Sequence, residues 1–288
     1  MEHMIVADHV SDWCAGERAE GRPIGLVPTM GAFHEGHLSL IRRARSECDR
    51  VVVYLFVNPL QFGSDEDYAR YPKDVARDEV LAESLGADLF FTPALEDMYP
   101  RGYPPGPADV IHPGPIGDVL EGMARPGHFE GVLTAVHRLL SIVGDCRAYF
   151  GEKDAQQLFL VREMAEARFP GVDVVACPTV REPGGLALSS RNARLSDGEH
   201  AAAASLSAGL FAAERAYVDG ERDATHLSAA LLGPMAAEPL VEVDYAVIVD
   251  PATFEVVLTA GDQALGLVAA HVGLTRLIDN LRLDDRGS

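Results

Sequence analysis

His34 and His37 lie three positions apart in the segment PTMGAFHEGH (residues 28–37), which also contains Gly31 and Gly36. Imidazole side chains can bind a metal or donate hydrogen bonds to phosphate oxygens. A zinc site would favour His-x₃-His on a helix or further Cys and His ligands nearby, and this segment has neither. Glycine permits positive φ and close approach of a ligand to the backbone. A structural turn and a phosphate-binding corner at a helix start are therefore the two interpretations to weigh, and we favour the second.

The elements that must position this segment are predicted from the period of the apolar residues. We expect strands at Ile24–Val27, Val51–Val57, Asp88–Phe91, Arg147–Phe150 and Val172–Cys177. We expect helices at His37–Glu47, Asp74–Leu85, 132–143 and Ala155–Arg168. Alternating strands and helices predict βαβ units, and hence a doubly wound, Rossmann-like parallel sheet in an α/β domain.

The pattern changes near residue 183. We therefore predict a first domain over 1–182 and a smaller C-terminal α+β domain over 183–288. In the second domain we expect helices at Glu199–Val218 and near Ala224–Leu232, and strands at Val241–Val249, Phe254–Leu258 and Leu265–His271.

Composition excludes several classes of protein. The chain has 288 residues, 48% of them hydrophobic, and a formal net charge of −20, which argues against a nucleic-acid-coating protein. The four cysteines form no CxxC pair, which is typical of a protein in the reducing cytoplasm. No apolar run approaches the roughly 18 residues needed to span a membrane, so we expect no membrane segment.

Polar segments follow four of the predicted strands. They are Thr29–His37, Asn58–Gln61, Gly151–Asp154, and Pro178–Arg181 with Ser189–Arg191. Ligands of parallel sheets bind at the carboxyl ends of the strands. The sequence therefore predicts an active site at this edge, rich in amides, histidines and cations.

Several of these residues also have plainer interpretations. Lys153 suits a polyphosphate, although a surface lysine is the ordinary alternative. Ser189–Arg191 could supply hydroxyl and guanidinium donors to phosphates or could be an ordinary capped loop. Arg125 and His128 precede the helix 132–143, where anion binding and helix capping are equally reasonable.

Strand, turn and His-x-Gly-His at a helix start are similar to the HxGH signature of nucleotidylyltransferases and class I aminoacyl-tRNA synthetases. Longer motifs distinguish one family among them: the chain resembles the pantoate–β-alanine ligases (pantothenate synthetases) over residues 23–280. The motifs in order are PTMGAFHEGH, FVNPLQF, ARYPKD, RPGHFEGV, AYFGEKDAQQL, PTVREPGGLALSSRN and GLTRLIDN. The chain departs from the family pattern at Phe33, Glu130 and Ala155, and none of these positions is assigned chemistry.

The resemblance implies ATP-dependent amide formation in two half-reactions. The carboxylate of (R)-pantoate attacks the α-phosphorus of ATP to give pantoyl adenylate and pyrophosphate. The amine of β-alanine then displaces AMP and forms pantothenate. The family also implies Mg²⁺ bound with ATP, a homodimer, and a C-terminal domain that closes over the active site. The alternatives are another HxGH cytidylyl- or adenylyltransferase, and a nucleotide sensor without activity.

Residue roles follow from the same resemblance. The implied ATP-binding residues are Met30, Gly31, His34, Gly36, His37, Gly151, Glu152, Lys153, Asp154, Val180, Leu188, Ser189, Ser190 and Arg191. His34, His37, Lys153 and Arg191 would be catalytic, with His37 the proton donor to pyrophosphate. Gln61 and Gln157 would bind pantoate, and Gln61 and Asn58 would bind β-alanine. The charged loop Gly63–Arg77 is interpreted as a mobile wall that shields the adenylate from water, with an ordinary solvated loop as the alternative.

Overall fold

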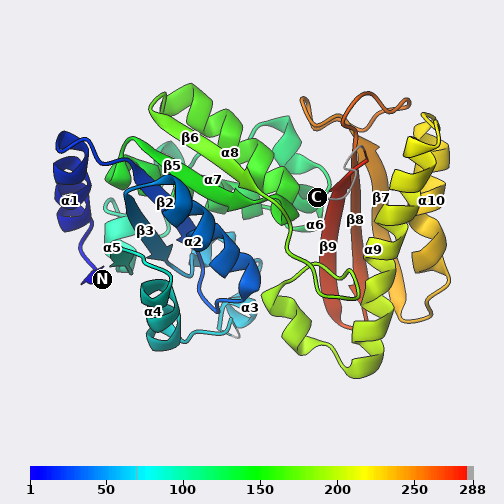
Figure 1. Cartoon of the computed structure of the whole chain (residues 1–288), viewed down its shortest axis with the longest axis horizontal. Helices are drawn as coiled ribbons and strands as arrows, with labels where there is room; N and C mark the ends of the chain where they lie inside the picture. The colour runs from blue at the N-terminus through cyan, green and yellow to red at the C-terminus, as the bar shows by residue number, and fades with distance from the viewer. Residues whose placement is uncertain (70, 284–288) are drawn as a thin grey trace. The chain divides into compact units, whose positions relative to one another are not determined.

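The apolar runs of the sequence form the strands of two separate sheets in the computed structural model (Figure 1). The structure describes residues 1–69 and 71–283; Arg70, in the ARYPKD motif, and residues 284–288 lie outside the described residues. The chain divides into two units by its internal contacts. Unit 1 comprises Met1–Gly151 and Gln156–Cys177, and unit 2 comprises Glu152–Ala155 and the chain from Pro178 onward.

Unit 1 contains a six-stranded parallel sheet in the order β1-β4-β3-β2-β5-β6. Its strands are β1 (Glu2–Met4), β2 (Ile24–Thr29), β3 (Arg50–Leu55), β4 (Leu89–Phe91), β5 (Cys146–Gly151) and β6 (Val172–Cys177). Its helices are α1 (Ala7–Ala19), α2 (Glu35–Glu47), α3 (Asp65–Ala69), α4 (Val75–Ser84), α5 (Leu95–Met98), α6 (Glu121–Ala124), α7 (His128–Val143) and α8 (Ala155–Arg168). The predicted doubly wound, Rossmann-like α/β class is confirmed.

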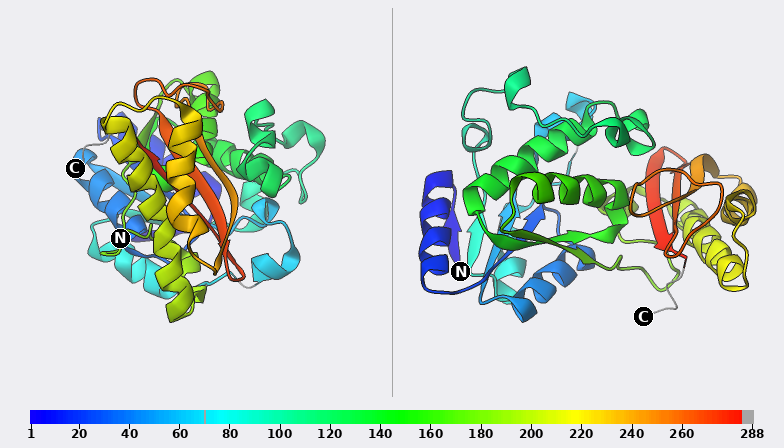
Figure 2. Two further views of the ribbon diagram at one scale, coloured as in Figure 1. Left: turned by 90° about the vertical axis from the view of Figure 1, so that its right-hand side faces the viewer. Right: turned by 90° about the horizontal axis from the view of Figure 1, so that it is seen from above.

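Alternating side chains of the central strands pack on opposite faces of this sheet. Val52 and Tyr54 of β3 belong to a core with α1, α7 and α8, whereas Val51, Val53 and Leu55 belong to a core with α2 and α4. Figure 2 shows α2 and α4 on the opposite side of the sheet from α7. Because successive strand residues point to opposite faces, a strand covered on both sides has one continuous apolar run.

Unit 2 packs two helices on one face of an antiparallel sheet (Figure 2). The helices are α9 (Asp197–Val218) and α10 (Ala224–Ala236), and the sheet has the order β7 (Val241–Val249), β8 (Leu265–Val272), β9 (Thr275–Arg282). Its core joins Leu206 and Leu210 of α9, Leu227 and Leu231 of α10, and Val268 of β8. Short 3₁₀ helices connect elements in both units: η1 (Pro59–Gln61), η2 (Pro107–Asp109), η3 (Pro115–Asp118), η4 (Glu152–Asp154) and η5 (Ser190–Arg194).

One predicted strand is wrong. Phe254–Leu258 is an extended segment with one isolated bridge, between Val256 and Val249, and it begins at Phe254, whose left-handed φ of 57° does not fit a strand. The third strand of unit 2 is instead β9, whose sequence TRLIDNLR mixes buried polar residues with apolar ones and lacks a clean alternating pattern. Neither β1 nor α1 was predicted from the sequence. The other predicted strands and helices are confirmed: Ala155–Arg168, Val172–Cys177 and Val241–Val249 have the predicted bounds, and the rest have shifted ends.

Candidate active site

The turn after β2 is held by a carboxylate from α4. Gly31 and Ala32 adopt left-handed φ values of 83° and 54°. The Ala32 and Phe33 backbone N–H groups donate to Asp78 Oδ2 and Oδ1 at 2.6 and 2.9 Å. The Asp78 side chain is buried, and these two bonds give a partner to both of its oxygens and to both N–H groups of the turn. Asp78 therefore fixes the backbone that leads into the histidine pair.

Asp78 was not identified from the sequence. Burial raises the pKa of its carboxyl, and the hydrogen bonds from Phe33 and Ala32 act in the opposite direction. An acidic residue inside an amphipathic helix normally indicates a solvated face, and the sequence contains no signal that pairs Asp78 with a turn more than forty residues away.

Asp78→Ala is expected to lower the free energy of unfolding by about 2–4 kcal/mol, because it leaves two buried N–H groups without an acceptor. Urea denaturation measures this change, and Glu79→Ala is the control because its carboxylate lies beside His3 near the surface. A loss no larger than that of Glu79→Ala would contradict the role of Asp78.

The pKa of the Asp78 carboxyl is raised in the folded state, so its contribution to stability is present at low pH and decreases as pH rises through the folded-state pKa. In Asp78→Asn the free energy of unfolding should not show this decrease with pH.

His34 and His37 form the N-terminal cap of α2. His34 Nδ1 accepts from the Gly36 backbone N–H at 3.2 Å, and His37 Nδ1 accepts from the His34 backbone N–H at 3.4 Å. The two ring centroids are 4.2 Å apart. Because an accepting Nδ1 carries no proton in a neutral imidazole, the hydrogen-bond network assigns the proton of each neutral ring to Nε2. Each ring is thus an Nε2–H donor at the start of a helix that follows a parallel strand.

Gly36 has a local reason to be glycine. A Cβ atom there would lie 2.9 Å from Cε1 and Nδ1 of His34, closer than side-chain carbons pack. Glycine thus leaves room for the His34 ring to cap the helix. This steric reason stands beside the expected role of Gly36 in letting a ligand approach the backbone.

A second polar cluster follows β3, the neighbour of β2 in the sheet. The buried Asn58 donates its two amide hydrogens to Gln61 Oε1 at 3.1 Å and to Gly131 O at 3.0 Å. Its Oδ1 accepts from the Tyr99 hydroxyl at 2.5 Å and from Leu60 N–H at 3.1 Å. In the structure the Asn58 amide thus orients Gln61.

Arg125 and His128 also converge on Gln61. His128 Nδ1 donates to the Gln61 backbone oxygen at 2.9 Å, Arg125 Nη2 donates to the same oxygen at 3.3 Å, and Arg125 Nη1 donates to His128 Nε2 at 3.1 Å. Gly131 lets α7 approach this loop, since a Cβ there would lie 2.5 Å from Leu60 O. The sequence left both residues with an open role, and the structure places them beside a predicted substrate-binding glutamine.

Of the adjacent glutamines at the start of α8, Gln156 is used structurally. It is buried, its Oε1 accepts from Glu121 N–H at 3.1 Å, and its Nε2 donates to Ile116 O and Val119 O at 2.6 and 3.0 Å. These bonds hold the loop before α6. Gln157, the predicted pantoate ligand, is only partly buried.

The segment 63–77 contains α3 and the first turn of α4. Among its described side chains, Tyr68 and Tyr71 make edge contacts with the Phe62 ring, at centroid distances of 5.5 and 5.7 Å. Lys73 Nζ lies 4.3 Å from the centre of the Tyr68 ring. The segment is therefore packed around Phe62, directly after Gln61, and the mobile wall stays a hypothesis.

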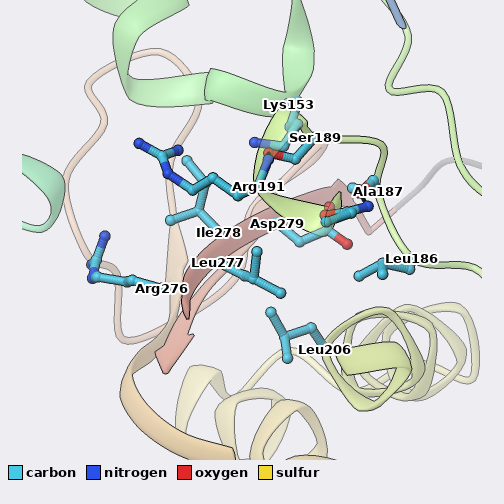
Figure 3. Close-up of a pocket in the computed structure, with 11 residues that line it drawn as sticks. Lys153, Leu186, Ala187, Ser189, Arg191, Leu206, Arg276, Leu277, Ile278 and Asp279 are labelled. Atoms are coloured by element: carbon cyan, nitrogen blue, oxygen red, sulfur yellow. Dashed lines mark hydrogen bonds between the residues drawn. The ribbon is translucent and has the colours of Figure 1, made fainter. Parts of the chain in front are cut away.

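The chain leaves unit 1 at the carboxyl ends of β5 and β6, after Gly151 and Cys177. In unit 2, Lys153, Ser189, Arg191 and Asp279 line one pocket (Figure 3). Lys153, Ser189 and Arg191 lie together on one side of it, and Leu206 lies on the opposite side. The Lys153 side chain is 16% exposed, and its Nζ is 3.6 Å from Asp154 Oδ1. Three predicted phosphate-binding residues are thus brought together within this unit.

The Ser189–Arg191 loop extends from a tight reversal of the chain. Leu188 N–H donates to Val180 O at 2.9 Å, so two of the predicted ATP-binding residues are hydrogen-bonded to each other through their backbones. Ser189 Oγ accepts from Arg191 N–H at 3.2 Å and caps η5. Asn192 Nδ2 donates to Glu182 Oε1 and Ala187 O, both at 3.1 Å. The loop that carries Ser190 and Arg191 therefore has a defined backbone.

Two absences hold for residues 1–69 and 71–283. No group of three His, Cys, Asp or Glu side chains is arranged to hold a metal ion. Within the same residues, no helix is long and apolar enough to cross a bilayer.

A parallel Rossmann-like sheet with an HxGH pair at the first helix after a central strand defines an α/β enzyme of the nucleotide-binding type. The chain belongs to the pantoate–β-alanine ligase family, whose sequence model matches residues 4–282, and it is accordingly a ligase that joins pantoate to β-alanine. This identification confirms the family inferred from the motifs.

Individual relatives support the assignment along the whole chain. Pantothenate synthetase of Rubrobacter xylanophilus is 51% identical over 270 residues, covering 92% of this chain and 93% of the relative. A crystal structure of pantothenate synthetase from Thermus thermophilus matches with a TM-score of 0.90 and 43% identity, covering 98% and 99% of the two chains. The pantoate–β-alanine ligase of Francisella tularensis, solved with βγ-ATP and β-alanine, matches with a TM-score of 0.75 and 33% identity, covering 99% of this chain and all of that one.

Proposed function

We propose that this ligase works through a pantoyl-adenylate intermediate. A carboxylate oxygen of (R)-pantoate attacks the α-phosphorus of ATP, the bond to the β-phosphate oxygen breaks, and pyrophosphate leaves. The amine of β-alanine then attacks the acyl carbon, AMP leaves with the bonding electron pair, and the amine loses a proton. No side chain is acylated in this scheme.

The observation that carries the proposal is the pair of Nε2–H donors at the start of α2. Negative charge builds on the leaving oxygens while pyrophosphate departs, and fixed donors aimed at those oxygens stabilise the transition state more than the ground state. The N-terminus of α2 adds a dipole that favours negative charge. Its Gly36 and His37 backbone N–H groups are already donated to His34, so we assign the phosphate hydrogen bonds to the side chains. We assign His37, as its imidazolium form, as the proton donor to pyrophosphate and His34 as a second phosphate donor. The proton on Nδ1 of the imidazolium would replace the hydrogen bond that the neutral ring accepts from His34 N–H.

The polar cluster around Gln61 suits the two smaller substrates. Gln61 and Gln157 are proposed to bind pantoate, because a neutral carboxamide bonds its hydroxyl groups without competing for its carboxylate charge. Gln61 and Asn58 are proposed to bind β-alanine, with Arg125 and His128 fixing the Gln61 backbone from behind. The Asn58 amide would act mainly by orienting Gln61, since both its hydrogens are already donated.

The cations and hydroxyls of unit 2 suit the triphosphate. Lys153 and Arg191 are proposed to neutralise phosphate charge, and Ser189 and Ser190 to donate hydrogen bonds. The remaining proposed nucleotide contacts are Met30, Gly31, Gly36, Gly151, Glu152, Asp154, Val180 and Leu188. The Francisella tularensis ligase is complexed with βγ-ATP in its crystal structure, which supports ATP as the nucleotide here. We propose that Mg²⁺ accompanies ATP and assign it no residue, because the described side chains offer no preformed metal cluster.

Two wider proposals concern the setting of the enzyme. We propose that the enzyme works in the cytoplasm, because its four cysteines are all free and buried, as suits a reducing compartment. The homodimer implied by the family resemblance is proposed as the solution state and is testable by light scattering.

The decisive experiment follows pyrophosphate and AMP separately. With ATP, Mg²⁺ and pantoate we expect an enzyme-stoichiometric burst of pyrophosphate, and with β-alanine added we expect continuous release of both products. AMP release that needs no β-alanine would contradict the two-step scheme. CTP in place of ATP tests the cytidylyltransferase alternative, and EDTA tests the need for Mg²⁺.

A further inference from the structure

The GLTRLIDN motif ends in a residue with an unusual position in unit 2. Asn280 lies on β9 and is buried. Its Nδ2 donates to two successive backbone oxygens, Glu152 O at 2.9 Å and Lys153 O at 2.8 Å. Both amide hydrogens of Asn280 are therefore used on the short segment that carries Lys153.

Asn280 is itself rigidly placed. It pairs with Leu267 in the β8–β9 ladder, and its N–H donates to Asp279 Oδ1 at 2.8 Å. The neighbouring Asp279 side chain is 1% exposed and accepts from both terminal nitrogens of Arg181, at 2.6 and 3.0 Å. Arg181 also donates to Asn280 O and Gly185 O, each at 3.0 Å. Because Arg181 and Asp279 are paired and hydrogen-bonded, a shift of the strand would leave the buried Asp279 carboxylate without its partner.

Lys153 needs such a support. It sits in η4, a 3₁₀ helix of only three residues, Glu152–Asp154. Helices of this kind have poor hydrogen-bond geometry and depend on external contacts. Its side chain lines the same pocket as Ser189 and Arg191 (Figure 3). The position of the Lys153 ammonium thus depends on where the carboxamide of Asn280 holds the backbone.

We propose that Asn280 is a positioning residue for Lys153, with the Arg181–Asp279 pair holding Asn280 in register. The proposal rests on the proposed binding of ATP phosphates by Lys153. It assigns a role to the last motif of the chain, which the reaction scheme leaves without one. Asn280 touches no substrate in this proposal; it acts through the backbone oxygens of Glu152 and Lys153.

Asn280→Ala is expected to lower the rate of pyrophosphate release by about 10- to 100-fold, because small displacements of a catalytic group have effects of this size. A double-mutant cycle separates positioning from general damage. If Asn280 acts only through Lys153, Asn280→Ala combined with Lys153→Ala should be no slower than Lys153→Ala alone. Effects that multiply would overturn the proposal. Arg282→Ala is the matched control on the same strand, because its guanidinium contacts Gln263 at the surface.

Separate controls distinguish a loss of folding from a loss of function. Circular dichroism checks each variant, and Asn280→Asp is the second variant because it keeps the shape but presents oxygen to both carbonyls. We expect it to be folded and at least as impaired as Asn280→Ala. Failure of both variants to fold would overturn the proposal, since Asn280 would then be a folding determinant.

The affinity for α,β-methylene ATP, measured by calorimetry, distinguishes failure of this proposal from failure of the reaction scheme. A wild-type enzyme that binds the analogue but releases no pyrophosphate contradicts the adenylate scheme. In that case the same double-mutant cycle on affinity still decides the role of Asn280. A wild-type enzyme that turns over while Asn280→Ala matches it in rate and affinity contradicts the positioning role alone.

Discussion

Replacing Lys153 by alanine is expected to lower the rate of pyrophosphate release from ATP and pantoate by about 10²-fold or more, the usual loss for a donor aimed at transition-state charge. The net charge of −20 makes the surrounding field unfavourable to a triphosphate, so the local cations carry most of the attraction. Lys153 is largely shielded from solvent, and its Nζ lies 3.6 Å from Asp154 Oδ1, which orients the ammonium.

Rapid-quench measurement of the first turnover tests this expectation. Arg162→Ala is the charge-matched control, because this exposed guanidinium on α8 donates to the Val174 carbonyl at 3.4 Å and has no assigned part in the reaction. Lys153→Arg should recover part of the rate if the charge matters more than its shape. A Lys153→Ala enzyme that forms adenylate normally and is slow only in the β-alanine step would refute the assigned role.

Replacing His37 by alanine should have an effect of similar size, about 10²-fold or more on the same step. The ring supplies an Nε2–H donor at the start of α2, and its Nδ1 also contacts the His34 backbone N–H. Part of the loss could therefore come from the helix cap, which is worth about 1 kcal/mol. The unfolding free energy of the variant measures that part.

His37→Gln distinguishes a proton donor from a hydrogen-bond donor. A carboxamide can donate a hydrogen bond but cannot give up a proton at neutral pH. If His37 transfers the proton to pyrophosphate, His37→Gln should be nearly as slow as His37→Ala; recovery of most of the rate would show that the ring only shares its hydrogen. His226→Ala serves as control, since this exposed ring pairs with Glu221 at the surface of unit 2.

Much of the fold could be predicted from local features of the sequence. The β-branched run of β3 and the apolar stripe of α7 are each recognisable within one element, because side-chain period follows from backbone geometry. The strand β9 was missed for the opposite reason. Its buried Asp279 and Asn280 break the apolar pattern, and they are tolerated only because Arg181 and the Glu152–Lys153 backbone satisfy them.

The sequence by itself determined the parallel α/β class, the family, and the polar segments that follow four of the strands. The tertiary structure decided which side chains hold them: Asp78 reaches the turn before His34, Asn58 orients Gln61, and Asn280 fixes the backbone of Lys153. The reason is physical. Periodicity and motif spacing are properties of neighbouring residues, whereas the acceptor of a buried N–H group can come from any part of the chain and is known only once the chain has folded.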